Sequence, residues 1–346
     1  MSFAIRGTAA LASAALTAGM AAGSLAAAPT ATAAPTSCDS LEVIAHRGDD
    51  TRGIDQNTVA AYDKVNRNGY SIEADVWVDA EQVLWMFHDR STFKSTGTPG
   101  LINQMTTAEV EALRYRKAGS PLLKLEDAFT AFEAYPETRV YLEPKNPSVA
   151  DDVADAVVAR GRTTSTWITG YTDQVRAAQP TVQVVQKVDG TLPRRPRAFL
   201  RAGVGIVAGQ SGRLEARTVA RYQRRGIEVQ GRNIKKTGSW RRLIQAGADA
   251  QLTDRPAGLV AFCPVALEDP RIKPRRSGRT GPRAMVIRGS FFYDVQNVRV
   301  AGREVAFKVA SPQRIDARIK GVRAKRVRVY VRTPNGAVER TVRLRR

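Results

Sequence analysis

Histidine and cysteine are scarce in this chain of 346 residues, which contains two of each. Long, strongly apolar segments are also scarce. The one long uncharged segment, at 7–28, consists largely of Ala, Leu, Gly, Ser and Thr, and no second such segment follows it. Such weakly apolar residues anchor poorly in a bilayer, which argues against a membrane protein. No Leu-x-x-Cys pattern precedes Cys38, so we expect no lipid attachment there.

The N-terminal segment has the features of a secretory signal peptide. Arg6 precedes the uncharged run, and the small residues at 31–33 follow it as a cleavage signature. We therefore expect residues 1–34 to be removed after Ala33 or Ala34, and the mature protein to be secreted.

The formal net charge of +21 is unevenly distributed. From Arg271 onward the chain has 22 Lys and Arg residues and four acidic residues, whereas the segment between the signal and Arg271 is nearly neutral. So basic a segment attracts polyanions by charge alone. For a secreted protein the expected partner is an anionic cell-envelope polymer or a membrane surface, not nucleic acid. The alternative is a basic surface that is simply solvated.

Apolar residues make up 43% of the chain, enough for a sizeable core. Short apolar segments alternate with helical patterns such as 58–67 and 149–160, which predicts an α/β fold. Thr106 and Glu109 have the spacing of a capping box. A parallel (β/α)8 barrel and an open doubly wound sheet both give this alternation, which leaves both open. The expected strands are 41–45, 71–77, 139–143, 165–169, 181–186, 203–207, 227–230 and 250–252.

The amino-acid composition changes at 267–282, which is rich in Pro and Arg. An extended linker is expected there. Residues 283–346 contain neither His nor Cys, so no catalytic constellation is expected there. Their short strand patterns predict a small antiparallel sandwich. The expected strands are 284–287, 295–300, 305–309, 315–319, 327–331 and 338–344.

The two histidines end apolar, strand-like runs, Val-Ile-Ala-His46 and Leu-Trp-Met-Phe-His88. Between them, Glu73 and Asp75 interrupt an apolar strand two residues apart, so both side chains point to the same face, toward the barrel axis. Two adjacent carboxylates repel each other and are costly to bury unless a cation compensates them.

A third strand supplies another inward acid, Glu143, followed two residues on by Lys145. Oxygen-only ligation by this residue together with Glu73 and Asp75 predicts one hard cation, Mg2+ or Ca2+. Lys145 could instead be only a structural partner of Glu143. Asp254 follows the last expected strand and is expected to cap the next helix rather than to act in catalysis.

These residues belong to an ordered series of motifs. From about residue 41 to 262 the chain resembles the glycerophosphodiester phosphodiesterase family, which implies a (β/α)8 TIM barrel at 38–266 and settles the choice of fold. The motifs that carry the resemblance are His46-Arg47-Gly48, Asp55-Gln56-Asn57-Thr58, Glu73-x-Asp75, His88-Asp89, Leu125-Glu126-Asp127-Ala128, Leu142-Glu143-Pro144-Lys145 and 248–256.

The resemblance implies a role for each motif. His46 and His88 would be the acid-base pair at the substrate phosphate, while Arg47 and Lys145 would neutralise its oxygens. The three carboxylates would hold the metal ion. In the family, the substrate's own glycerol hydroxyl attacks the phosphorus, and water then opens the resulting cyclic phosphate.

Two departures from the family pattern bear on activity. Gln56 stands where the family usually has a glutamate that binds the metal; its amide oxygen brings no charge, so we expect a weak ligand and lower metal affinity or altered selectivity. An aromatic side chain usual on the seventh strand is missing around 229–233. This second departure weakens the expectation about substrate preference most.

The basic C-terminal strands resemble an immunoglobulin-like module of the IPT/TIG type, which agrees with the sandwich expected at 283–346. The segments that carry this second resemblance are 289–292, 298–302, 305–309 and 327–336.

Three functions are compatible with these motifs. The first is metal-dependent hydrolysis of glycerophosphodiesters to an alcohol and glycerol phosphate, in lipid or envelope-polymer metabolism. The second is a phospholipase D-like relative of the sphingomyelinase D type, which forms a cyclic phosphate and also lacks the carboxylate replaced here by Gln56. The third is an envelope-binding protein with a decayed barrel site.

Cys38 and Cys263 are expected to form a disulfide. Export places the chain in an oxidising compartment, where an even number of cysteines favours pairing. One cysteine precedes the first barrel strand and the other lies in the last helix, and barrel closure brings these ends together. Two buried free thiols are the alternative.

Overall fold

The computed structural model describes residues 38–51, 53–232, 237–293, 295–333 and 335–344. The expected signal peptide at 1–34 lies outside the described residues. Within those ranges, no helix is both long and apolar enough to cross a bilayer.

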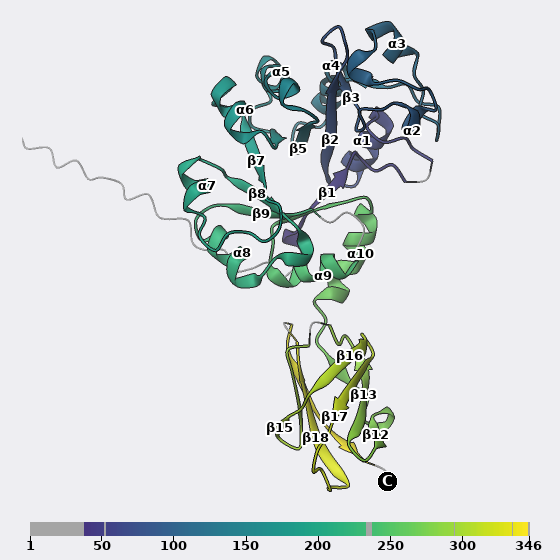
Figure 1. Ribbon diagram of the computed structural model, residues 1–346, viewed down its shortest axis with the longest axis vertical. Coiled ribbons are helices and arrows are strands. Elements are labelled where there is room, and N and C mark those ends of the chain that lie inside the picture. Colours follow the sequence, from purple (N-terminus) through teal and green to yellow (C-terminus); the bar gives the residue numbers. More distant parts are fainter. Residues whose placement is uncertain (1–37, 52, 233–236, 294, 334, 345–346) are drawn as a thin grey trace, which may run out of the picture. The chain divides into compact units, whose positions relative to one another are not determined.

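Eight parallel strands form a closed barrel (Figure 1). The first strand pairs in parallel with both the second and the last, which an open doubly wound sheet does not do. The predicted (β/α)8 barrel is therefore confirmed. In chain order its strands are β1 (Glu42–His46), β2 (Ser71–Val78), β5 (Val140–Pro144), β6 (Thr166–Thr169), β7 (Gln183–Lys187), β8 (Ile206–Gly209), β9 (Glu228–Gly231) and β10 (Ala250–Thr253).

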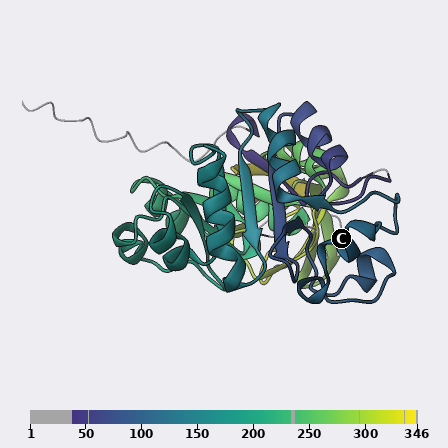
Figure 2. The ribbon, with the colours of Figure 1, turned by 90° about the horizontal axis from the view of Figure 1, so that it is seen from above.

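Helices lie around the outside of the strands, as the view from above shows (Figure 2). Alternation along β2 explains the layers: Ile72, Ala74 and Val76 pack outward into the cluster that holds the helices, so Glu73 and Asp75 face the barrel interior. The helices are α1 (Val59–Arg67), α4 (Leu125–Glu133), α5 (Pro147–Ala159), α6 (Thr172–Ala178), α7 (Arg197–Arg201), α8 (Ala216–Gln223), α9 (Thr237–Ala246) and α10 (Pro256–Ala266).

A lobe inserted between β2 and β5 carries His88. It contains β3 (Leu84–Met86), α2 (Phe93–Thr96), η2 (Ile102–Gln104), α3 (Thr107–Ala112) and β4 (Leu123–Lys124), and β3 pairs antiparallel with β2. Buried Asp79 fixes the β2–β3 turn, because its carboxylate accepts bonds from the Trp85 indole, the Thr107 hydroxyl and two backbone amides. The predicted capping box of Thr106 and Glu109 starts α3.

The C-terminal domain is a sandwich of two antiparallel sheets around one apolar core, as predicted. The IPT/TIG assignment stays a prediction. One sheet contains β11 (Arg271–Ile272), β12 (Gly278–Gly281), β13 (Ala284–Ser290), β16 (Phe307–Ser311) and β17 (Arg314–Arg318). The other contains β14 (Asn297–Val300), β15 (Arg303–Glu304), β18 (Arg326–Arg332) and β19 (Ala337–Arg343).

The expected linker at 267–282 is wrong over most of its length. Both β11 and β12 pair with β13, and the single turn η4 (Pro274–Arg276) lies between them. Proline lacks a backbone N–H, and here it flanks very short strands, so the composition resembles that of a linker although the segment belongs to the sheet. The sandwich therefore begins near residue 271, not 283.

The predicted disulfide is present. Cys38, in η1 (Cys38–Ser40), is joined to Cys263 in α10, with 5.8 Å between the two Cα atoms. The bond joins the segment before β1 to the helix after β10, the two strands at which the barrel closes.

Candidate active site

The candidate site lies at the carboxyl ends of the barrel strands, where barrel enzymes place their catalytic groups. His46 is the last residue of β1, and Lys187 is the last residue of β7. Lys145 and Asp254 each follow directly on a strand, β5 and β10 respectively. Residues from distant parts of the chain meet here because the barrel is closed.

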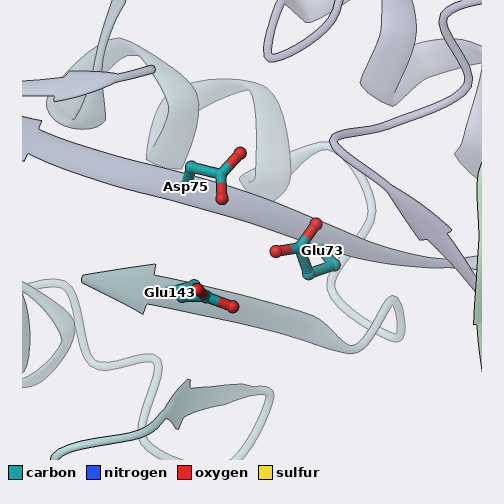
Figure 3. A group of neighbouring side chains, drawn as sticks. All are labelled: Glu73, Asp75 and Glu143. Carbon is teal, nitrogen blue, oxygen red and sulfur yellow. The ribbon is translucent and has the colours of Figure 1, made fainter. Parts of the chain in front are cut away.

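Three carboxylates form the floor of the site, and Figure 3 shows Glu73 and Asp75 on β2 beside Glu143 on β5. Asp75 is the register partner of Glu143, and one oxygen of each of the three lies within 4.8 Å of the others. Glu73 is 3% and Asp75 is 1% exposed. Burial, together with the negative charge of Asp75, raises the pKa of Glu73.

Cationic side chains surround these carboxylates. Arg47 places its Nε 3.1 Å from an Asp75 oxygen, and its backbone amide donates to Glu73 over 3.0 Å. The Lys145 ammonium lies 3.1 Å from Asp75 and 2.9 Å from Glu143. The predicted phosphate-binding and metal-binding residues are therefore brought together in one cluster.

Lys187 is a member of this cluster that sequence analysis did not single out. Its ammonium lies 2.9 Å from the same Glu143 oxygen that Lys145 contacts. Burial of Glu143 disfavours its charge, but the two lysines outweigh that effect and lower the pKa of the Glu143 carboxyl. Once a barrel is assumed, the end of the strand expected at 181–186 is the signal that could have identified Lys187.

The loop between β1 and α1 is held in a specific conformation. Arg47 and Asn57 both have left-handed backbones, with φ of 60° and 53°. The backbone N–H of Asn57 donates a hydrogen bond to the backbone carbonyl of Arg47. The buried Asn57 side chain donates to Asp75 and accepts from Tyr62. Gly48 has φ of 79°, and a Cβ there would lie 2.8 Å from that of Ala61.

Gln56 lies beside Arg47. Its amide oxygen accepts a hydrogen bond of 3.0 Å from the Arg47 guanidinium. Gln56 therefore orients the cation that contacts Asp75, and its weak metal-ligand role stays a prediction.

His46 is held by Asp254, at 2.5 Å between Nδ1 and the carboxylate oxygen. The expectation that Asp254 caps α10 is wrong: the cap position is Arg255, without a side-chain cap bond. Asp254 ends up beside His46 because β10 and β1 are neighbours. Burial disfavours the imidazolium, but the charge of Glu73 and the hydrogen bond that Nδ1 donates to Asp254 outweigh it and raise the pKa of His46.

His88 follows β3 and is held from both sides. Its Nδ1 lies 2.7 Å from an Asp89 oxygen, and its backbone carbonyl accepts from the Trp77 indole over 2.8 Å. Its pKa is lowered, chiefly by burial and also by the positive charges of Lys145 and Arg47, although Asp75 acts in the opposite direction. The two histidines thus have pKa values shifted in opposite directions, which is the condition for an acid and a base to work side by side.

A hollow inside the barrel mouth adjoins the carboxylates. It is lined by Glu73 and Glu143, by Tyr141 and Thr169, and by Arg232 just after β9. The Arg232 guanidinium is 2.7 Å from Asp189 and so is fixed at this rim. A charged group thus stands near the position where the usual aromatic side chain is missing.

Comparisons with known proteins agree with this geometry. The chain matches the Glycerophosphoryl diester phosphodiesterase family over residues 46–258. A comparison with curated proteins finds no match.

Several solved structures share the barrel fold. The chain is similar to a glycerophosphodiester phosphodiesterase from Parabacteroides distasonis, with 20% identity and a TM-score of 0.57 over 66% of this chain and 99% of that one. It is also similar to a putative glycerophosphodiester phosphodiesterase from Galdieria sulphuraria, with 16% identity and a TM-score of 0.57 over 65% of this chain and 98% of that one. A third similar structure is a phosphodiesterase from Oleispira antarctica in complex with the product sn-glycerol-3-phosphate. Its identity to this chain is 19% and the TM-score is 0.56, over 64% of this chain and 95% of that one.

The family match covers more than half of the chain and begins at His46, the first of the two histidines of the site. It includes every carboxylate, histidine and cation of the cluster described above. The chain therefore belongs to the glycerophosphoryl diester phosphodiesterase family.

Proposed function

We propose that the protein hydrolyses glycerophosphodiesters to an alcohol and glycerol phosphate, with His46 and His88 as its acid-base pair. The observation that carries this proposal is the arrangement of two histidines, each held through Nδ1 by its own aspartate, around a cluster of carboxylates and cations. In both rings this leaves Nε2 as the nitrogen that can meet the substrate.

The opposite pKa shifts of the two rings support the following assignment of the proton transfers. Neutral His88 accepts the proton of the attacking glycerol hydroxyl as its oxygen bonds to phosphorus. Protonated His46 donates a proton to the alkoxide that leaves as the P–O bond to the alcohol breaks. For the ring-opening step the roles reverse, so that His46 accepts a proton from water and His88 returns one to the glycerol oxygen.

The negative phosphate needs cations beside it, because its charge repels the nucleophile. Arg47, Lys145 and Lys187 supply three positive charges at the cluster. Lys145 and Lys187 share Glu143 in this structure, so a bound phosphate would compete with Glu143 for their ammonium groups.

The carboxylate cluster fits the divalent cation on which the family depends. Glu73, Asp75 and Glu143 would hold Mg2+ or Ca2+ through three oxygens, with Gln56 as a weak additional ligand. A cation bound there would withdraw charge from the phosphate oxygens and stabilise the developing negative charge.

We further propose secretion, with the basic domain binding an anionic cell-envelope polymer or membrane surface. The signal-peptide pattern at 1–34 supports export, and so does the Cys38–Cys263 disulfide, since such bonds persist in oxidising compartments. The product in the Oleispira antarctica complex supports a glycerophosphodiester as substrate.

Gln56 favours one competing function. A relative of the sphingomyelinase D type would stop at the cyclic phosphate, and the missing carboxylate is a feature it shares with this chain. An envelope-binding protein with a decayed site would not turn over at all.

Product analysis separates these functions. With glycerophosphocholine, glycerophosphoethanolamine and sphingomyelin, each assayed with Mg2+ and with Ca2+, we expect free alcohol plus glycerol phosphate from the two glycerophosphodiesters. Accumulation of a cyclic phosphate would identify the phospholipase D-like reaction of the sphingomyelinase D type. Absence of product with every substrate and metal would contradict both enzymatic proposals. His88→Ala is the blank for each assay.

A further inference from the structure

Outside the barrel site, the C-terminal sandwich contains a concave hollow of about 800 Å³. Seven arginines line it, and none of its lining residues is acidic. Three of them, Arg275, Arg276 and Arg279, come from η4 and β12, in the segment whose composition resembled a linker. The remaining four come from β13, β17, β18 and β19.

These four arginines form two like-charged pairs. Arg288 on β13 is the register partner of Arg314 on β17, and Arg326 on β18 is the register partner of Arg343 on β19. Like charges directly opposite each other on neighbouring strands destabilise a sheet. Two such pairs at one hollow are therefore unfavourable until an anion compensates them.

Compensation within the protein is small. Arg314 forms an ion pair with Asp316, at 2.8 Å, and no ion pair involves the other six arginines of the hollow among the residues that the structure describes. The guanidinium of Arg279 is fixed by the carbonyls of Pro282 and Val322, so it is preorganised as a donor. The hollow thus presents six guanidinium groups without an ion-pair partner among the described residues, and one of them, Arg279, is held in place.

We propose that this arginine hollow binds a polymer with repeating phosphodiester groups. Guanidinium groups match phosphate oxygens in two-pronged hydrogen bonds, and a flexible chain can enter a concave surface that a flat bilayer cannot. The domain also has little with which to insert into a membrane, since Val309 is its only exposed large apolar side chain among the described residues. The phosphodiester linkage rests on the proposed function, because the same linkage would be the substrate of the barrel.

The test compares two triple variants of the full chain with equal changes in charge. One is Arg288→Gln, Arg326→Gln, Arg343→Gln in the hollow; the other is Arg303→Gln, Arg318→Gln, Arg323→Gln, all exposed and outside it. The probe is a fluorescent glycerol phosphate oligomer, and binding is measured by anisotropy on a His88→Ala background so that the barrel does not cleave it. Excess sn-glycerol 3-phosphate occupies the barrel site.

The hollow triple should raise the Kd for the oligomer at least about tenfold, roughly the loss expected for one charge-assisted bond, and should flatten its salt dependence. The control triple should change the Kd less than about threefold. Equal losses in both variants would overturn the proposal, as would equal affinity for polyglutamate. Binding to phosphatidylglycerol vesicles but not to the oligomer would overturn it in favour of a membrane.

Two further readouts separate this proposal from folding and from the proposed function. Removing the like-charged pairs should leave the Tm unchanged or raise it, whereas a large fall in Tm would mean that the arginines are structural and would contradict the proposal. If the triple variant does not fold, the single variant Arg326→Gln supplies the binding result, with a smaller expected increase in the Kd for the oligomer. Hydrolysis of glycerophosphocholine by both triples in the wild-type background should be unchanged, and its absence from every variant would contradict the barrel proposal alone.

Discussion

At the scale of single residues, the site depends on two aspartates that each hold a histidine. Asp254 holds His46 and Asp89 holds His88, in each case through Nδ1. The pKa values of the two rings nevertheless shift in opposite directions. Burial, with Lys145 and Arg47, lowers the pKa of His88, whereas at His46 the charge of Glu73 and the hydrogen bond to Asp254 outweigh burial and raise it. Similar contacts to an aspartate thus accompany opposite pKa shifts.

Loss of either imidazole should abolish most of the activity. His46→Ala and His88→Ala should each lower kcat at least about 100-fold, the usual scale for a general acid or base. Steady-state kinetics with glycerophosphocholine measure this, and an unchanged Tm confirms that the variants fold. Near-complete activity of either variant would contradict the two-histidine mechanism.

Asp254→Asn should move the pH profile in one direction. The carboxylate raises the pKa of His46, so its removal lowers that pKa. Because the role proposed for His46 requires its protonated form, the alkaline limb of kcat/KM should shift to lower pH, while the acidic limb, assigned to His88, should stay in place. A shift of the acidic limb instead would exchange the roles of the two rings.

Gln56→Glu should tighten metal binding. The new carboxylate adds negative charge beside Arg47 and the carboxylate cluster, so the metal concentration for half-maximal activity should fall. Titration of chelator-treated protein with Mg2+ and with Ca2+, followed by calorimetry and by activity, measures this. Full activity in excess chelator would remove the metal role assigned to Glu73, Asp75 and Glu143.

At the scale of elements, strand alternation places the chemistry. On β2 the odd positions Glu73 and Asp75 face inward and the even positions pack against helices, so one strand serves both the core and the site. The adjoining β2–β3 turn depends on buried Asp79, which accepts four hydrogen bonds and lies on the chain segment that leads to His88.

Asp79→Ala should destabilise this inserted lobe. It leaves four donors without their acceptor, including the Trp85 indole, and should lower the free energy of unfolding by about 2–4 kcal/mol. Denaturant titration measures the loss. Glu81→Ala, which removes an exposed carboxylate from the same turn, is the matched control and should cost about 1 kcal/mol or less. Equal effects would show that Asp79 does not fix the turn.

Sequence patterns were sufficient for the strands and for the residues within one motif. Hydrophobic periodicity located all eight barrel strands, and spacing placed Glu73 and Asp75 on one face, because both depend on local geometry. Contacts such as that between His46 and Asp254, 208 positions apart, depend on which strand ends meet. Short strands without apolar residues, such as β12 with its sequence Gly-Arg-Thr-Gly, lack the apolar signal by which strands are recognised.

At the scale of the whole molecule, one covalent bond joins the two sides of the barrel seam. The Cys38–Cys263 disulfide spans a sequence separation of 225 residues, and the chain-entropy model values such a loop at about 5 kcal/mol. The double variant Cys38→Ala, Cys263→Ala should therefore unfold at lower denaturant concentration than the oxidised protein. Reduced wild-type protein should match the variant, and coincident curves for all three would contradict a stabilising role.

This seam also imposes an order of events on a chain that emerges from its N-terminus. Cys38 precedes the first strand and Cys263 lies in the helix after the last, so the covalent ring cannot close until all eight strands have been delivered. A chain truncated anywhere within the barrel retains a single thiol that lacks its native partner and stays exposed to mixed disulfides. Formation of the disulfide between Cys38 and Cys263 therefore requires that all eight barrel strands have been synthesised.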